Sequence, residues 1–171
     1  IRETFNLLAE GVNYHFYSDN KSINNYKKFS DDIIIFIEGY VLPRSKYFAE
    51  YKTNNQFDLV HKLYKEKGIE CLKRLKGLFN LIIADGNNII IANDQTGVRK
   101  YFYKFSDNEY FITDGLSNFD KSDFSVDEIE MIMFSLMEHN IDGKTLFKRI
   151  GFPNPGMYIK INGEIKTGTY F

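Results

Sequence analysis

Three pairs of short apolar runs, each joined by a tight turn, constrain the fold of this chain more than any other feature. The runs are rich in β-branched and aromatic residues and the turns contain Gly, Asn or Asp, a combination typical of β-hairpins. Successive hairpins make antiparallel sheets, so they exclude a doubly wound parallel fold and indicate an α+β domain. The paired strands are predicted at Leu78–Ala84 with Asn88–Ala92, Tyr101–Phe105 with Glu109–Thr113, and Met157–Ile161 with Glu164–Thr169.

Two further stretches are predicted as strands outside these hairpins. Ile33–Ile37 is short and continuously apolar, which is typical of a strand that is buried on both faces. Val12–Tyr17 alternates between apolar and polar residues and is predicted as an edge strand. Both strands would add to the sheets that the hairpins begin.

Two regions have the periodicity of helices. Apolar residues recur at helical spacing from Phe57 to Gly68 and resume as far as Leu75, so this pair of helical segments is expected to pack against one side of a sheet. A second helix is predicted from Ser125 to about His139. Its start would be an S-x-x-E capping box, and its apolar face would consist of Ile129, Ile132, Met133 and Leu136.

Length and composition restrict the class of protein. Residues 1–171 are most simply one domain that buries its own core. The 22 Lys and Arg residues nearly balance 23 Asp and Glu residues, so a net charge of -1 provides no field to attract nucleic acid or an anionic membrane. No apolar run approaches the roughly 18 residues of a membrane helix, and no signal peptide is recognisable. One Cys excludes an internal disulfide, and a cytoplasmic protein is expected.

The residues that could carry chemistry are few. The three His residues have no metal-ligand spacing, so no metal site is predicted. Cys71 lies beside the apolar face of a predicted helix and is interpreted as a buried structural thiol. Asp94 and Gly97 are typical of a turn at a strand end. Glu38 and Gly39 directly follow a buried strand, so they could present a carboxylate and backbone N–H groups at a pocket mouth, although a plain strand-end glycine is favoured.

The order of the motifs resembles a known family. The stretch "DLVHKLYKEKGIECLKRLKGLFNLIIADGNNIIIANDQTGVRKYFY" resembles the central part of class II glutamine amidotransferase domains, the N-terminal half of asparagine synthetases. The stretches "EYFITDGLSNF" and "TLFKRIGFPNPGMYIKINGEIKTGTYF" resemble the segments that close these domains. The resemblance covers about Ile33 to Phe171. It implies the four-layer αββα sandwich of two antiparallel sheets found in N-terminal-nucleophile hydrolases, with Asp94 and Gly97 as parts of a structural turn.

The residues that the resemblance assigns to glutamine hydrolysis are replaced here. Residue one is Ile1 where the family has a nucleophilic Cys, and Cys71 corresponds to no catalytic element. Where the family has N-G-E, with an Asn that donates to the oxyanion, this chain has Glu38, Gly39 and Tyr40. The family's G-D-T-E segment, whose Asp holds the substrate ammonium, becomes Asn55-Gln56-Phe57-Asp58, with Gln56 in place of that Asp. The R-H-R-G-P loop that clamps the glutamine carboxylate has no counterpart, and no catalytic residue is predicted.

These replacements predict a glutaminase-like domain that no longer hydrolyses glutamine. Its role would be structural, or to bind a small ligand in the former pocket, beside an ATP-dependent synthetase that is C-terminal or separate. ATP and Mg would belong to that partner, and no cofactor is expected in this domain. The alternatives are an active glutaminase that supplies ammonia for asparagine synthesis, and a stand-alone binding module. A homodimer is left open, and neither a nucleic acid nor a membrane partner is expected.

Overall fold

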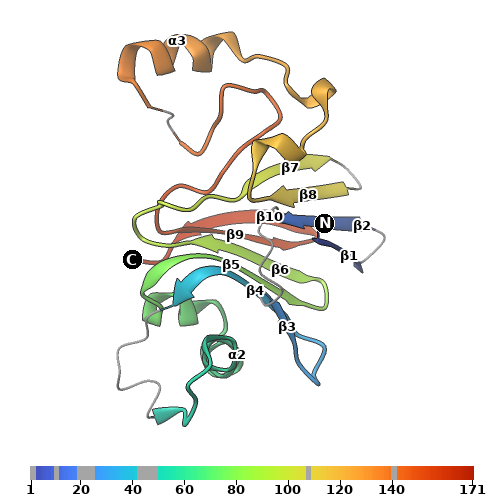
Figure 1. The fold of residues 1–171 in the computed structure, drawn as a ribbon, viewed down its shortest axis with the longest axis vertical. Coiled ribbons are helices and arrows are strands. Elements are labelled where there is room, and N and C mark those ends of the chain that lie inside the picture. The colour runs from blue at the N-terminus through green and yellow to red at the C-terminus, as the bar shows by residue number, and fades with distance from the viewer. Residues whose placement is uncertain (1–2, 10–11, 19–25, 42–49, 107–108, 140–141) are drawn as a thin grey trace. The chain divides into compact units, whose positions relative to one another are not determined.

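The computed structural model describes residues 3–9, 12–18, 26–41, 50–106, 109–139 and 142–171 (Figure 1). Of residues 3–9, 12–18 and 109 it describes the backbone alone. The chain forms two compact units, one of residues 1–21 and 100–154 and the other of residues 22–99 and 155–171. Each unit is built on one sheet, and the predicted hairpins are confirmed as β5–β6, β7–β8 and β9–β10.

The second unit contains a fully antiparallel sheet with the strand order β10-β9-β6-β5-β4-β3. Its strands are rich in Ile because both faces of the inner strands are buried. The predicted strand at Ile33–Ile37 corresponds to the first half of β4, which begins one residue later, at Ile34, and continues three residues beyond Glu38. The bounds are β3 Tyr26–Lys28, β4 Ile34–Val41, β5 Gly77–Asp85, β6 Asn88–Asn93, β9 Met157–Asn162 and β10 Glu164–Thr169.

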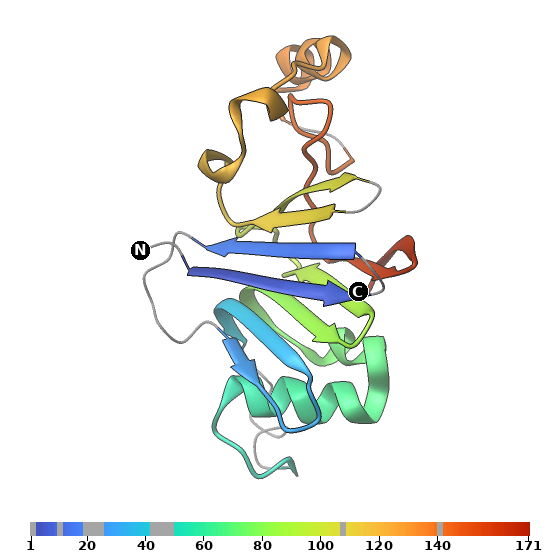
Figure 2. The ribbon, with the colours of Figure 1, turned by 90° about the vertical axis from the view of Figure 1, so that its right-hand side faces the viewer.

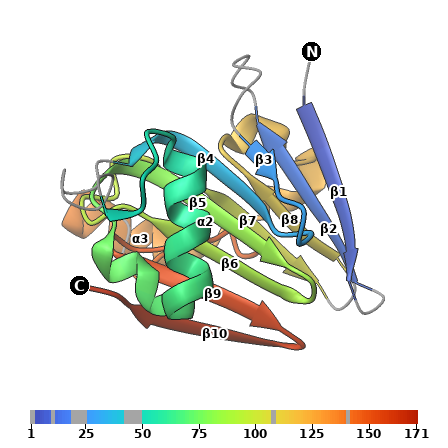
Figure 3. The ribbon, with the colours of Figure 1, turned by 90° about the horizontal axis from the view of Figure 1, so that it is seen from below.

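One face of this sheet packs against helix α2, Gln56–Lys67 (Figure 3). Side chains alternate along a strand, so every second residue of β4 and β5 reaches the helix. Gly68 has a φ of 56° and ends α2. The helical segment that follows, Gly68–Arg74, is a 3-10 helix rather than a continued α-helix. The core between helix and sheet includes Ile35, Ile37, Leu81 and Ile83 of the strands with Leu59, Leu63, Cys71 and Leu72 of the helices.

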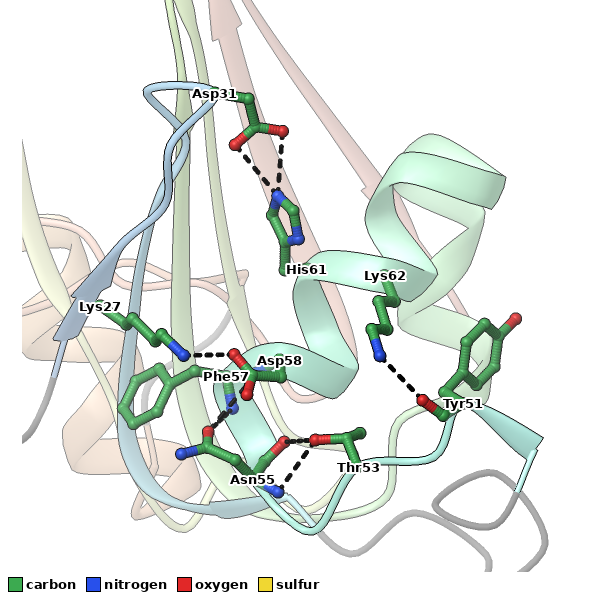
Figure 4. Close-up of polar contacts among 9 residues, drawn as sticks. All are labelled: Lys27, Asp31, Tyr51, Thr53, Asn55, Phe57, Asp58, His61 and Lys62. Atoms are coloured by element: carbon green, nitrogen blue, oxygen red, sulfur yellow. Dashed lines mark hydrogen bonds and ion pairs between the residues drawn. The ribbon is translucent and has the colours of Figure 1, made fainter.

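The first turn of α2 has a local cause that is visible in the sequence. Asn55 is the N-cap, and its Oδ1 accepts hydrogen bonds from the backbone N–H of Phe57 at 2.8 Å and of Asp58 at 3.5 Å (Figure 4). Such a cap satisfies two of the four N–H groups that a helix start leaves without a partner. It fixes where Gln56 and Asp58 lie.

The first unit contains a four-stranded sheet with the order β1-β2-β8-β7 (Figure 2). The predicted edge strand at Val12–Tyr17 is wrong in its position, because β2 pairs with β1 on one side and with β8 on the other. The β2–β8 pair is parallel. No hairpin joins these two strands, so their direction is not set by a turn. The bounds are β1 Glu3–Ala9, β2 Val12–Ser18, β7 Phe102–Ser106 and β8 Glu109–Thr113.

Helix α3, Glu128–Met137, is shorter than predicted and is capped by a different residue. Asp127 accepts from the N–H groups of Ile129 and Glu130, so the predicted capping box that begins at Ser125 is wrong. The carbonyl of Ser125 instead accepts from the N–H of Lys148 at 2.9 Å, which holds residue 125 outside the helix. Among the described residues no helix is both long enough and apolar enough to span a membrane.

Candidate functional site

A polar row crosses the six-stranded sheet at its β4, β5 and β6 strands. The register places Glu38 opposite Asn80 and Asn80 opposite Asn93. Their neighbours Ile37 and Leu81 belong to the core beneath α2. Because successive side chains point to opposite faces, the polar row lies on the face away from α2.

Glu38 is held by two donors. Asn80 Nδ2 donates to one carboxylate oxygen at 2.9 Å, and Arg99 Nη1 donates to the other at 2.7 Å. The Glu38 side chain is 14% exposed, whereas that of Arg99 is 42% exposed. The buried Asn80 uses its amide N–H on Glu38, and its Oδ1 accepts no hydrogen bond from the part of the chain that the structure describes. The row therefore presents acceptor atoms, with Arg99 as a cation at its rim.

Gly39 has the backbone conformation that lets Arg99 reach Glu38. Its φ is 95°, a region that side-chain-bearing residues rarely adopt. A Cβ at this position would lie 2.2 Å from the carbonyl oxygen of Leu78 and 3.1 Å from Nε of Arg99. Only glycine fits between these groups. Tyr40, the next residue, is 48% exposed and makes no described hydrogen bond in the row.

Gln56 and Asp58 are occupied elsewhere. Gln56 Oε1 accepts from the backbone N–H of Val41 at 3.1 Å, which ties the start of α2 to the end of β4. Asp58 forms an ion pair with Lys27 of β3 (Figure 4). Among the described residues no hydrogen bond or ion pair joins either side chain to Glu38.

Asp94 and Gly97 form a tightly bonded turn after β6. Asp94 Oδ1 accepts from the N–H of Thr96 at 2.7 Å and of Gly97 at 3.0 Å, and Oδ2 accepts from the N–H of Phe79 at 3.3 Å. Asp94 is fully buried. Gly97 has a φ of 61°, and a Cβ there would lie 2.7 Å from Cγ of Pro155. These contacts are of the kind that a turn requires, and none leaves a carboxylate oxygen directed at a ligand.

Asn80 and Arg99 were not predicted as site residues. The sequence contains a signal that could have identified Asn80: it is a single polar residue inside the apolar run of β5, and such a residue needs a buried partner. No sequence signal points to Arg99 as a partner of Glu38, because 61 residues separate the two. Only the folded chain brings the two together.

Cys71 is enclosed in the core and is expected to be unreactive. It is fully buried, and this desolvation raises the pKa of its thiol to about 12, with the charge of Glu70 adding to the effect. Because the thiolate is the reactive form, almost none is present near neutral pH. A disulfide-exchange reagent is expected to label no Cys in the native chain and one Cys in denaturant. Stoichiometric labelling under native conditions would contradict this burial.

Among the described residues, no group of three or more His, Cys, Asp or Glu side chains is placed to hold a metal ion. His61 is engaged by other groups, because its ring stacks on Phe29 with the ring centroids 3.9 Å apart. Its Nε2 lies 3.0 Å from a carboxylate oxygen of Asp31 (Figure 4). Lys65 also pairs with Asp31, at 3.2 Å. This cluster links the β3–β4 turn to α2.

The Asp31 cluster predicts an acid-sensitive contact. Desolvation opposes ionisation of Asp31, but the hydrogen bonds from His61 and Lys65 outweigh it and lower the pKa of Asp31. A carboxylate with a lowered pKa stabilises the fold above its unfolded pKa, and this contribution is lost as the pH falls through the folded value. We expect Asp31→Asn to flatten the decline of stability below about pH 4, measured by denaturant unfolding at several pH values. An unchanged pH profile would mean that Asp31 contributes nothing.

Comparison with known proteins gives four likenesses. A family model described as a glutamine amidotransferase domain matches residues 42–171. A protein of Methanocaldococcus jannaschii, named as a candidate glutamine-hydrolysing asparagine synthetase, is 28% identical over 131 residues, 72% of this chain. Two solved structures are similar in fold. Glutamine phosphoribosylpyrophosphate amidotransferase of B. subtilis, complexed with ADP and GMP, has a TM-score of 0.52 and 15% identity over a match that covers 85% of the chain. An allosteric regulatory enzyme of purine biosynthesis has a TM-score of 0.54 and 17% identity, with 88% covered.

These likenesses confirm the predicted α+β fold class. The matches cover only part of each relative. The chain spans 24% of the archaeal protein and 31% and 30% of the two chains of known structure.

Proposed function

The chain belongs to the glutamine amidotransferase domain family, and from this premise we propose that it is a member that does not hydrolyse glutamine and serves beside an ATP-dependent, amide-forming synthetase. It is related to asparagine synthetase, with 28% identity to the archaeal protein. Under this proposal the domain supports its partner structurally or holds a small ligand, and catalyses no amide cleavage.

The observation that carries the proposal is that position 38 holds a carboxylate, Glu38, whose two oxygens already accept hydrogen bonds. Amide hydrolysis needs hydrogen-bond donors at about 2.7–3.1 Å from the developing oxyanion. The family resemblance puts the side-chain donor at position 38, where this chain has a carboxylate that already accepts from Asn80 and Arg99. A carboxylate repels an oxyanion, and Asn80 directs an acceptor rather than a donor from the same row. The anion at this position therefore disfavours a tetrahedral intermediate.

Gln56 gives independent support. The resemblance assigns the carboxylate that holds the substrate ammonium to this position, and a neutral amide replaces it. The amide oxygen of Gln56 accepts from the N–H of Val41. A neutral group with an occupied acceptor attracts an ammonium much less than a free carboxylate does. Glu38 and Gln56 thus weaken two different steps, oxyanion stabilisation and substrate binding.

The synthetase partner is proposed from the relatives. The chain corresponds to about a quarter of the archaeal protein, whose name describes an asparagine synthetase, so the domain would work next to a larger region that forms an amide. ATP and Mg would bind to that partner, and a cytoplasmic location is part of the proposal. The buried Cys71 thiol is compatible with a reducing compartment.

Glutamine turnover tests the proposal. The protein is purified with the N-terminus that it has in the cell, its intact mass is recorded, and release of glutamate and ammonia from glutamine is measured. Release no faster than from a heat-denatured sample is expected. Turnover above that background would overturn the proposal. A Cys71→Ala variant, measured in parallel, would then decide whether the buried thiol or a group at the N-terminus acts as nucleophile.

A further inference from the structure

The β9–β10 hairpin carries an Asn-Gly dipeptide at its tip. Asn162 is the last residue of β9 and Glu164 is the first of β10, so Gly163 alone links the two strands. Both Asn162 and Gly163 are exposed. In the part of the chain that the structure describes, neither the side-chain amide of Asn162 nor the N–H of Gly163 takes part in a hydrogen bond. No contact therefore keeps these two adjacent groups from reacting with each other.

The other asparagines of the sequence lack this combination, because Asn162 is the only one that Gly follows. A side chain on the following residue shields its backbone nitrogen, whereas glycine leaves that nitrogen open. The side chain of Asn55 is committed to capping α2, and Asn80 is fully buried. The nitrogen that follows Asn154 belongs to Pro155 and carries no proton. Position 162 thus joins an exposed amide to an open neighbouring nitrogen.

We propose that Asn162 is a site of spontaneous deamidation, in which Gly163 supplies the nucleophile. Asparagine is among the chemically labile residues of proteins. Hydroxide removes the proton from the backbone nitrogen of Gly163, and this nitrogen attacks Cγ of Asn162 to close a five-membered succinimide ring. The side-chain nitrogen takes a proton from water and leaves as ammonia.

Water then opens the ring at one of its two carbonyl carbons. Attack at Cγ breaks the bond from Cγ to the nitrogen of Gly163 and leaves an aspartate at position 162. Attack at the main-chain carbonyl carbon breaks the bond from that carbon to the same nitrogen and leaves an isoaspartate. In both cases one water is consumed and one ammonia is released, so the reaction needs no oxidant, reductant or cofactor.

The two products affect the hairpin differently. An aspartate at position 162 would lie opposite Glu164, and like charges that face each other across two strands are unfavourable. An isoaspartate runs the chain through its side-chain carbon, which adds one backbone atom at the tip. The residue after β10 is anchored, because the Tyr170 hydroxyl donates to the carbonyl of Asn93 and the Tyr170 N–H donates to the carbonyl of Gly156 at 3.1 Å. The extra atom is therefore expected to disturb the β9–β10 register and to lower the midpoint of denaturant unfolding.

Peptide mapping by mass spectrometry tests the proposal on the purified chain, incubated at neutral and at mildly alkaline pH. Exchange of the amide NH₂ for OH raises the mass of a peptide by about 1 Da. The peptide that contains Asn162 is expected to gain this mass at least about tenfold faster than those that contain Asn55 or Asn88, which precede residues with side chains. The rate is expected to rise with pH, because only the deprotonated nitrogen attacks.

Two variants serve as references. In Asn162→Gln the longer side chain would have to close a six-membered ring, so the mass gain at this position should nearly disappear. Asn162→Asp supplies the aspartyl product, from which the isoaspartyl form is separated by chromatography. Circular dichroism spectra establish that both variants keep the fold.

Two results would overturn the proposal. In the first, position 162 stays unmodified in the native chain while it converts in denaturant, which would mean that the folded tip protects Asn162. In the second, position 162 of the native chain converts no faster than Asn55. The measurement is independent of glutamine turnover, so its failure and the failure of the proposed function are distinguishable.

Discussion

Replacing Asp94 by alanine is expected to lower the free energy of unfolding by about 3–5 kcal/mol. The fully buried carboxylate accepts from the backbone N–H groups of Phe79, Thr96 and Gly97. Alanine would leave the N–H groups of Phe79 and Thr96 without this acceptor, whereas that of Gly97 keeps the backbone carbonyl of residue 94 at 3.2 Å. Each buried donor left without a partner costs about 1–3 kcal/mol, partly recovered where water enters. The loss would appear as a lower midpoint of denaturant unfolding.

Two further variants identify the cause of that loss. Asp94→Asn keeps one acceptor oxygen but places an N–H₂ group near one set of backbone donors, so about half of the stability should remain. Glu164→Ala removes a carboxylate that is 76% exposed and paired with Lys166 at 3.2 Å, and should change stability by less than about 0.5 kcal/mol. If Asp94→Ala were as mild as Glu164→Ala, the structural role assigned to the Asp94 turn would be wrong.

Gly39→Ala is expected to cost more than about 3 kcal/mol. Two effects add: alanine is disfavoured at a φ of 95°, and its Cβ would meet the Leu78 carbonyl oxygen at 2.2 Å. The oxygen belongs to the adjacent strand β5, which cannot move without breaking its pairing with β4. The expected result is a large loss of stability in denaturant unfolding, with the Glu38–Arg99 contact disturbed as well.

Gly86→Ala separates the two effects. Gly86 has a φ of 55°, but a Cβ there meets nothing within 4 Å. Its substitution should cost about 1 kcal/mol from backbone strain alone. The difference between the Gly39 and Gly86 variants then measures the clash with β5 together with the additional strain of a φ of 95° over one of 55°. Equal losses would show that Gly39 is required for its conformation and not for the close approach.

The elements with local signals could be predicted from the sequence. The dipeptides Asp85-Gly86 and Asn162-Gly163 predict their hairpins, because such turns need residues that tolerate a positive φ. The spacing of Phe57, Val60 and Leu63 likewise predicts α2. In each case the residues that determine the element are close in the chain, so no knowledge of distant partners is required.

Features that depend on distant partners could not be predicted in this way. The parallel β2–β8 pair joins residues that are 96 positions apart, such as Asn13 and Glu109. The edge position of β1 follows from that pair, because β2 is bound by β8 on its other side. The N-cap of α3 moves from Ser125 to Asp127 because Lys148 bonds to residue 125. Glu130 of α3 pairs with Lys144, and this contact cannot be predicted from the helical spacing of the apolar residues.

In the candidate site, too, some features could be predicted from the sequence and others could not. The replacements at Glu38 and Gln56 are visible in the sequence once the resemblance is drawn. The contacts that occupy them are not, because Arg99 approaches from a loop and Asn80 from the neighbouring strand. The sequence thus indicates which groups are replaced, and the structure adds what the replacing groups bind.

Glutamine binding, measured by titration calorimetry on the purified chain, tests the central claim most directly, because binding does not depend on the nucleophile at the N-terminus. If Glu38 and Gln56 are committed to Arg99, Asn80 and Val41, no binding tighter than about 1 mM is expected. A dissociation constant for glutamine in the micromolar range would mean that the pocket still recognises the substrate, and would contradict the account.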